Sequence, residues 1–276
     1  MLYQIYIFLF LLFSLSCVQS EDHLKCTQCR FTYSFTQSFS VPDNCPLIDA
    51  TDTGCYVSLD FSFDQQQYTV NFGKKAGVEP TGSKNLSVSL TFYQSGLFKF
   101  YYSIQYRCSY RDDCTRDLAK YEVAQLLKRQ INYTAIITET RPLVLGPPLT
   151  PGNPSLSCYN GVRPGTCAAS PTLSGICAIL DNMWDKTTRI TCDYYTLYLG
   201  PRIKIYQSFE RNITTFNIYC TQQLCNTNRT LQTVKGIMFK YGVTTTPDGL
   251  LNDSQLIIST SFLMIVMLLF VIFNSE

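Results

Sequence analysis

The chain has 276 residues, 13 cysteines and a formal net charge of +2. Because this net charge is too small to produce a strong electrostatic field, we expect neither a nucleic acid nor an acidic membrane surface as the partner. The length, less two apolar ends, allows one large domain or two small ones.

The N-terminal stretch MLYQIYIFLFLLFSLSCVQS, residues 1–20, predicts a secretory signal peptide. Residues 5–15 are almost wholly apolar, and Val18 and Ser20 would be the small residues before the cleavage point. The segment before the apolar run contains no Lys or Arg, so an uncleaved N-terminal anchor stays open as the alternative. A bacterial lipoprotein signal is disfavoured because Ser14 replaces the expected aliphatic residue.

Residues 21–140 predict a first disulfide-rich β domain. Apolar and polar side chains alternate in three runs, 57–63, 86–92 and 98–106, as half-buried antiparallel strands require. Lysine, glycine and proline near residues 74–77 and 80–82 indicate turns.

A helix is predicted after Cys114. Apolar residues recur at helical spacing over 117–131, and Thr115 or Asp117 would serve as its N-terminal cap.

Residues 141–157, RPLVLGPPLTPGNPSLS, carry five prolines. Proline fixes φ and removes a backbone donor, so this stretch is predicted to resist helix and to form an extended linker. A second, more compact disulfide-rich domain is predicted at 158–240, with strands near 189–198, 203–210 and 215–219.

The cysteines predict an oxidising, extracytoplasmic environment. Cys17 lies in the signal peptide, and its removal leaves an even set that divides equally between the two halves. A zinc or redox site at Cys26–Cys29 is the alternative, but the only histidine is His23, so we expect no metal and no cofactor. The twelve remaining cysteines are Cys26, Cys29, Cys45, Cys55, Cys108, Cys114, Cys158, Cys167, Cys177, Cys192, Cys220 and Cys225.

N-glycosylation sequons agree with export, and each glycan would require a solvated surface. The sequons begin at Asn85, Asn132, Asn212, Asn228 and Asn252. Asn252 does not easily serve both as a sequon and as a lipid attachment point, so we expect glycans at the other four.

The C-terminal end, residues 256–276, is predicted to be a glycosylphosphatidylinositol (GPI) attachment signal. Its apolar run to Phe273 is followed only by Asn, Ser and Glu, whereas a stop-transfer helix usually has basic residues there. The small residues at 252–254 suit the attachment site, with the lipid on Asn252, and Gly249 and Ser254 are rival positions. Residues 241–255 would form a stalk that includes the attachment region. A single-pass transmembrane helix stays open as the alternative.

The sequence offers no catalytic constellation, so we expect no enzymatic activity. A nucleophile generally needs an adjacent base, and His23 stands alone near the new terminus. Asp112 and Asp113 are interpreted as a solvated acidic turn balanced by Arg111 and Arg116, not as a carboxylate pair for glycoside cleavage. A hydrolase with perturbed carboxylates in a cleft is the alternative class.

The motifs LSCY at 156–159 and CTQQLCN at 220–226 resemble the three-finger family of lymphocyte antigens and the urokinase receptor. The resemblance implies a disulfide hub from which three β-hairpins extend. It also implies that Asn226 braces the hub by hydrogen bonding to the chain near the first cysteine. The first half, from LKCTQC at 24–29 to Cys114, resembles the family more faintly, because Thr115 replaces the asparagine.

The resemblance also implies disulfide pairings, which the sequence itself leaves open. It favours the pairs Cys220–Cys225, Cys108–Cys114, Cys26–Cys55, Cys29–Cys45 and Cys158–Cys192.

These observations predict two tandem three-finger-like domains in an all-β, disulfide-rich glycoprotein at the cell surface. We expect it to bind an extracellular protein partner, by analogy with the family. Trp184 lies in a polar, loop-like stretch and is a candidate partner contact; the alternative is a tryptophan folded onto the hub.

Overall fold

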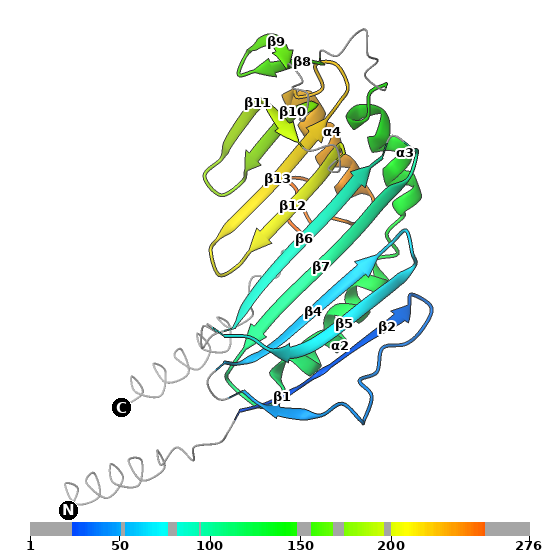
Figure 1. The fold of residues 1–276 in the computed structure, drawn as a ribbon, viewed down its shortest axis with the longest axis vertical. Coiled ribbons are helices and arrows are strands. Elements are labelled where there is room, and N and C mark those ends of the chain that lie inside the picture. The colour runs from blue at the N-terminus through cyan, green and yellow to red at the C-terminus, as the bar shows by residue number, and fades with distance from the viewer. Residues whose placement is uncertain are drawn as a thin grey trace, which may run out of the picture.

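The chain forms one long antiparallel sheet with helices along one face, as the computed structural model shows (Figure 1). Nine strands follow the order β11-β10-β13-β12-β6-β7-β4-β5-β2, and two small two-stranded sheets, β1-β3 and β8-β9, lie beside it. This architecture confirms the predicted disulfide-rich β class. The structure describes residues 24–50, 53–76, 82–93, 95–147, 156–167, 174–195 and 200–251.

The first half of the chain supplies five strands of the long sheet. The alternating runs at 57–63, 86–92 and 98–106 coincide with β4, β6 and β7, so these strand predictions are confirmed. Of the predicted turns at 74–77 and 80–82, residues 77, 80 and 81 lie outside the described part of the chain, and Lys74 still belongs to strand β5. Strands β1 and β3 form one of the small sheets. The strands of the first half are β1 Lys25–Thr27, β2 Cys29–Ser34, β3 Leu47–Asp49, β4 Cys55–Ser62, β5 Gln67–Lys74, β6 Ser83–Phe92 and β7 Phe98–Cys108.

The second half supplies the other four strands of the long sheet. The strands expected near 189–198, 203–210 and 215–219 correspond to β11, β12 and β13, with ends shifted by one to three residues. Strands β8 and β9 form the other small sheet. The strands of the second half are β8 Leu156–Asn160, β9 Arg163–Cys167, β10 Ser174–Asn182, β11 Thr187–Tyr195, β12 Arg202–Ser208 and β13 Ile213–Cys220.

The two halves have the same strand order and meet through equivalent strands. Within the first half the order is β5-β4-β7-β6, and within the second it is β11-β10-β13-β12. Strand β12 pairs antiparallel with β6, from Arg202 opposite Thr91 to Ser208 opposite Asn85. The halves expected to be tandem domains therefore share one continuous sheet.

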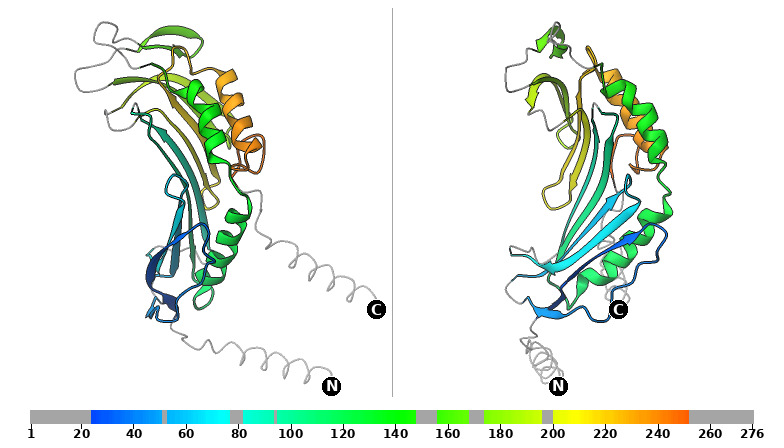
Figure 2. Two further views of the ribbon diagram at one scale, coloured as in Figure 1. Left: turned by 90° about the vertical axis from the view of Figure 1, so that its right-hand side faces the viewer. Right: turned by 45° about the vertical axis from the view of Figure 1, so that its right-hand side comes forward.

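Three helices lie on the same face of this sheet (Figure 2). Helix α2, Cys114–Lys128, confirms the helix predicted at 117–131, although it begins directly at the disulfide. Helices α3, Tyr133–Val144, and α4, Asn228–Lys240, were not predicted. Helix α4 begins after Thr227, whose side chain accepts a hydrogen bond from the Thr230 backbone N–H as an N-terminal cap.

The expectation that residues 141–157 resist helix is wrong for the first four of them. Pro142 lies in the last turn of α3, where its missing N–H leaves the carbonyl four residues earlier without its helical donor, a cost that the packing of the helix must offset. Burial of Ile136, Thr140 and Val144 along one stripe holds the helix against the sheet. The extended linker can begin only at Leu145, where the backbone is already in the β region.

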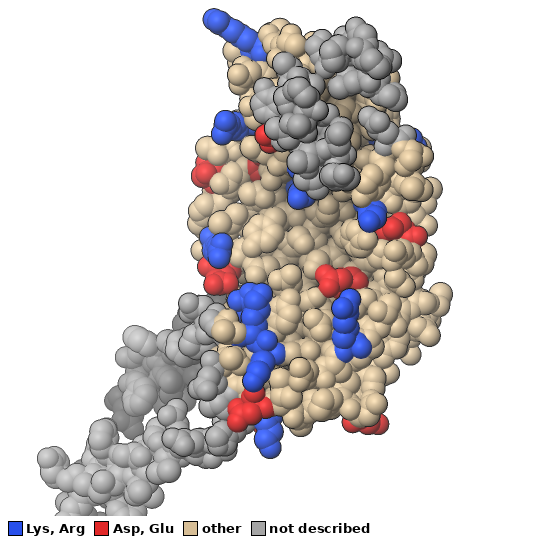
Figure 3. Space-filling model, viewed as in Figure 1, with Lys and Arg blue, Asp and Glu red and all other residues tan. Residues whose placement is uncertain are grey.

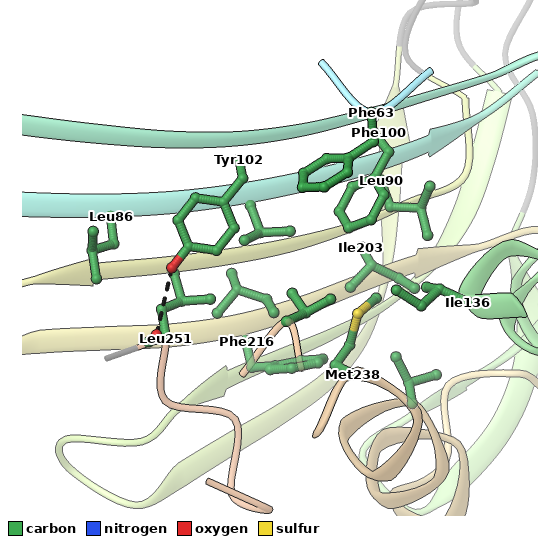
Figure 4. Packing of buried hydrophobic residues seen from close by; sticks show 14 of the residues in the cluster. Phe63, Leu86, Leu90, Phe100, Tyr102, Ile136, Ile203, Phe216, Met238 and Leu251 are labelled. Carbon is green, nitrogen blue, oxygen red and sulfur yellow. Dashed lines mark hydrogen bonds between the residues drawn. The ribbon is translucent and has the colours of Figure 1, made fainter. Parts of the chain in front are cut away.

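The core lies between the sheet and the helices (Figure 4). Phe100 and Tyr102 from β7 point into it beside Ile203 from β12 and Met238 from α4. The alternation of β6 shows why these strands form: its apolar side chains are buried toward the helices, and its serines lie on the other face. One core therefore spans both halves.

The segment that follows α4 belongs to this core, so the expectation of a stalk at 241–255 is wrong as far as residue 251. Val243 and Leu251 are fully buried. The Leu251 backbone N–H donates to Gln207, and its carbonyl accepts from Tyr102 Oη at 3.4 Å (Figure 4). Gly249, a rival attachment position, is buried against Phe216 with φ +103°.

The sheet face opposite the helices is polar but sparsely charged. It presents hydroxyl and amide side chains such as Ser87, Ser103 and Asn217, which alternate with the buried residues of β6, β7 and β13. Figure 3 shows scattered Lys, Arg, Asp and Glu among uncharged residues, with no broad area of one sign in this view.

Four of the five favoured disulfides are present: Cys26–Cys55, Cys29–Cys45, Cys108–Cys114 and Cys220–Cys225. The pairing of Cys158 with Cys192 is wrong, because Cys158 is bonded to Cys177 and Cys167 to Cys192. Cys177 and Cys192 stand directly opposite each other on β10 and β11. The two candidate partners of Cys158 are therefore only about 4.8 Å apart, the distance between neighbouring strands. The positions of the cysteines in the sequence do not distinguish between them.

Candidate functional site

A cavity of about 660 Å³ opens at the tips of the second-half hairpins. Its walls come from the β10–β11 turn, the β12–β13 turn, helix α4 and the segment before Leu251, so four parts of the chain meet there. We call this cavity the Trp184 pocket. Its lining residues are Asp181, Asn182, Met183, Trp184, Lys186, Gln207, Ser208, Phe209, Asn212, Thr214, Lys235, Asp248 and Leu250.

A buried ion pair forms one wall of the Trp184 pocket. Lys235 Nζ donates to Asp181 Oδ2 at 2.7 Å, and the two side chains are only 8% and 10% exposed. The other carboxylate oxygen of Asp181 accepts a hydrogen bond from Thr188 Oγ1 at 2.7 Å. Lys235 Nζ also lies 5.6 Å from the centre of the Phe216 ring. The pair joins β10 to α4 across 54 residues of sequence.

The rim of the pocket carries Trp184, which is 64% exposed. The turn around it is held by its own side chains: Asn182 Oδ1 accepts from the Trp184 backbone N–H at 3.1 Å, and Asn182 Nδ2 donates to Asp185 at 2.8 Å. Lys186 has φ +56°, which lets the chain turn back into β11. The alternative of a tryptophan folded onto the hub therefore does not describe Trp184.

The opposite wall is the loop between Thr245 and Leu250. The Thr245 backbone N–H donates to the Leu250 carbonyl at 2.7 Å and closes the loop. A Cβ on Gly249 would lie 2.7 Å from the Phe216 ring, so only glycine lets this loop approach the sheet so closely. This close approach brings Asp248 and Leu250 to the pocket.

Asn226 is fully buried at the hub, away from the pocket. Its Oδ1 accepts from the Tyr159 backbone N–H at 2.9 Å, and its Nδ2 donates to the carbonyls of Tyr159 and Thr191 at 2.8 and 3.1 Å. Tyr159 directly follows Cys158, so the brace near the first cysteine that the resemblance implied is present. The contact with β11 was not predicted.

The sequence predicts a solvated acidic turn at Asp112 and Asp113, but both side chains accept hydrogen bonds from strand β1. Asp113 accepts hydrogen bonds from the Thr27 backbone N–H at 3.1 Å and from its hydroxyl at 2.8 Å. Asp112 accepts from the Lys25 backbone N–H at 2.8 Å. Of the two flanking arginines, Arg116 lies 3.9 Å from Asp113, whereas Arg111 binds Asp117. Both carboxylates therefore fasten the first strand of the chain.

The sequons that the structure describes lie on different surfaces. Asn132, Asn212 and Asn228 are exposed, and Asn132 is the N-terminal cap of α3. Asn85 is half-buried on the open face of the sheet, 3.4 Å from Tyr206 Oη. Asn252 lies outside the described residues. Glycosylation at these positions stays a prediction.

Other predicted features also fall outside the described residues, namely His23, the signal peptide and the apolar tail at 256–276. Within the described ranges, no helix is long and apolar enough to cross a bilayer. The same ranges contain no cluster of three or more His, Cys, Asp or Glu side chains suited to holding a metal ion.

The chain was compared with family models, with curated proteins and with solved structures. No family model matches it, and no curated protein or solved structure matches it either.

Proposed function

We propose that this protein is a non-catalytic recognition glycoprotein, attached to the cell surface by a GPI lipid, that binds an extracellular protein partner at the Trp184 pocket. The observation that carries the proposal is Trp184 itself. A large aromatic side chain held exposed by an ordered turn, at the rim of a pocket, has the character of an interface hot spot.

The disulfides support the extracellular part of the proposal. All twelve cysteines that follow the expected signal peptide are paired. Such pairing is typical of proteins that fold in an oxidising compartment. The exposed asparagines Asn132 and Asn228, outside the Trp184 pocket, are compatible with glycosylation, whereas Asn212 lines the pocket and must carry no glycan if the partner binds there.

The arrangement of hairpins supports a distant relation to the three-finger family. In the second half the disulfides Cys158–Cys177 and Cys167–Cys192 join hairpin β8–β9 to hairpin β10–β11, and hairpin β12–β13 is attached through the pairing of β13 with β10. Asn226 braces this hub through Tyr159 and Thr191. Relationship to that family is part of the proposal, and so is recognition by analogy with it.

The lipid anchor would follow the folded body without a spacer. Leu251 is fixed in the core on the side of the sheet that carries the helices, and the proposed attachment residue, Asn252, comes next. The open sheet face would then point away from the attachment point.

The recognition role is tested by a photo-crosslinking amino acid at residue 184 of the full chain, displayed on cells of its source organism. The matched control places the same amino acid at Val162, which is 90% exposed in the β8–β9 turn, outside the Trp184 pocket. We expect a discrete crosslinked protein from position 184 and none from 162. Identical crosslinking patterns from both positions would contradict the proposal.

The anchor is tested by treating intact cells with a phosphatidylinositol-specific phospholipase. Release into the medium supports the lipid. Retention together with an intact peptide from Phe262 to Phe273 in the mature protein, detected by mass spectrometry, would replace the lipid with a single-pass span.

A further inference from the structure

The ammonium group of Lys235 is the most deeply placed cation of the Trp184 pocket. Among the described residues it donates one hydrogen bond, to Asp181 Oδ2, although an ammonium carries three N–H donors. Lys235 lines the pocket, its Nζ lies 5.6 Å from the centre of the Phe216 ring, and the residue is only 6% exposed. Burying a charge with so few partners is costly unless a further polar group completes it.

The carboxylates of the pocket offer less to a ligand. Both oxygens of Asp181 already accept a hydrogen bond, from Thr188 and from Lys235. Asp248 and Lys186 are exposed at the rim, where water screens their charges. Among the charged groups of the pocket, the unused hydrogen-bonding capacity of the buried pair therefore lies in the donors of Lys235, and this favours an anion over a cation.

The remaining wall is apolar. Met183, Phe209 and Leu250 line the cavity, and the indole of Trp184 stands at its rim. A volume of about 660 Å³ lies within the ordinary range of ligand pockets, roughly 300 to 1,000 Å³, and is large enough for more than one side chain.

We propose that the Trp184 pocket receives an acidic side chain of the protein partner together with a neighbouring apolar side chain. The carboxylate accepts hydrogen bonds from Lys235 Nζ, and the apolar group packs against Trp184. This inference rests on the proposed recognition function and specifies the chemistry of the partner.

The chain has one tryptophan, so its fluorescence reports on the pocket rim alone. We would titrate the full chain in detergent with phenylacetate, phenylacetamide and phenethylamine, which share an aromatic ring and carry an anion, a neutral amide and a cation. A hydrogen bond to a charged group contributes roughly 1.5 to 3 kcal/mol. We therefore expect phenylacetate to bind about tenfold or more tightly than phenylacetamide, and phenethylamine to bind most weakly.

Two variants of the same ion pair should shift the phenylacetate affinity in opposite directions. Lys235→Met removes the donor and should abolish the preference for phenylacetate over phenylacetamide. Asp181→Asn removes the competing anion and should tighten phenylacetate binding, which a purely structural ion pair would not do. Lys240→Met, on the same helix and outside the pocket, should leave the titration unchanged.

The Asp181→Asn titration keeps the test decisive even if Lys235→Met fails to fold, since it retains the lysine. Equal affinity for phenylacetate and phenylacetamide, or a preference for phenethylamine, would overturn the inference. Crosslinking from residue 184 without a carboxylate preference would overturn this inference and leave the recognition function standing. A carboxylate preference without crosslinking would support the pocket chemistry and remove the proposed partner role.

Discussion

The two halves of the sheet repeat one plan, and they differ in how each hub is braced. In the first half β7 ends at Cys108, closes a disulfide loop to Cys114 and enters α2. In the second half β13 ends at Cys220, closes a loop to Cys225 and is followed by α4. Both helices lie on the same face of the sheet (Figure 2).

The brace that Asn226 provides in the second half is provided by Asp113 in the first. Each side chain accepts a hydrogen bond from the backbone N–H of the residue after a hub cysteine, Tyr159 in one half and Thr27 in the other. Thr115, which occupies the position equivalent to Asn226, is buried, and its hydroxyl has no hydrogen-bond partner among the described residues.

The comparison shows that a structural task can be retained while its residue and position change. An amide both donates and accepts, so Asn226 also holds the carbonyl of Thr191 on β11. A carboxylate only accepts, so Asp113 fastens β1 alone. The second-half hub should therefore depend more strongly on its brace.

The largest expected effect is that of Asn226→Ala. The substitution removes three hydrogen bonds from a fully buried site, all of them to backbone groups of Tyr159 and Thr191. We expect the free energy of unfolding to fall by about 3 to 4 kcal/mol, measured by guanidinium unfolding with the disulfides intact. Asn226→Asp keeps the acceptor but places a buried carboxylate oxygen against the carbonyls of Tyr159 and Thr191, so it should cost at least as much as Asn226→Ala. A loss below about 1 kcal/mol would show that the disulfides hold the hub without the brace.

Much of this plan could be predicted from local patterns. Alternation located β4, β6 and β7, and helical spacing located α2, because both depend on neighbours in sequence. The apolar stripe Leu231, Val234 and Met238 was available to predict α4, and the cap at Thr227 would have supported it. The prolines after residue 141 concealed the stripe of α3.

The joining of the halves and the pocket depend on contacts that no local pattern encodes. Strand β6 alternates in the same way whether its edge is free or paired with β12. Asp181 and Lys235 come together only because β10 and α4 pack on each other. Trp184 was singled out by its polar surroundings alone, and its place at a pocket rim required the fold.

The second prediction concerns Tyr102, a β7 residue of the first half that donates a hydrogen bond to the Leu251 carbonyl of the second half. Its effect on stability tests how the two halves are held together. Burial is the main cause that raises the pKa of Tyr102, from 10.0 to about 12. The unfolded chain loses this proton first, so the stability it contributes is complete below pH 10 and is lost as the pH rises toward 12. At about 1.4 kcal/mol per pH unit, the loss reaches roughly 2 to 3 kcal/mol.

Tyr102→Phe should remove this alkaline loss, measured by rapid unfolding before disulfides exchange. The matched control is Tyr101→Phe, whose ring lies on the opposite face of the same strand. If both variants follow the parent protein through this range, another group controls the alkaline transition.

Asp113→Ala should have a smaller effect than Asn226→Ala, because this side chain makes two of its hydrogen bonds to β1 and is only partly buried. We expect a loss of about 1 to 2 kcal/mol in the same guanidinium assay. Asp112→Ala, which removes one exposed bond to Lys25, is the control and should cost about 0.5 kcal/mol. Equal losses for the two would mean that Asp113 is not the counterpart of Asn226.

The smallest effect concerns Glu139, which ties α3 to α4. Hydrogen bonds from Lys240, and then from Tyr241, lower the pKa of Glu139 below its ordinary value of 4.5. Because the folded pKa is the lower one, the stability that this group contributes is present above pH 4.5 and is lost as the pH falls through the folded value. Glu139→Gln should therefore lower the melting temperature slightly at pH 7 and flatten its dependence on pH below 4.5. Solvent screening keeps the shift small, and 0.5 M salt should reduce it further, at a Debye length of about 4 Å. An unchanged acid profile in the variant would mean that α3 and α4 are joined by their packed side chains alone.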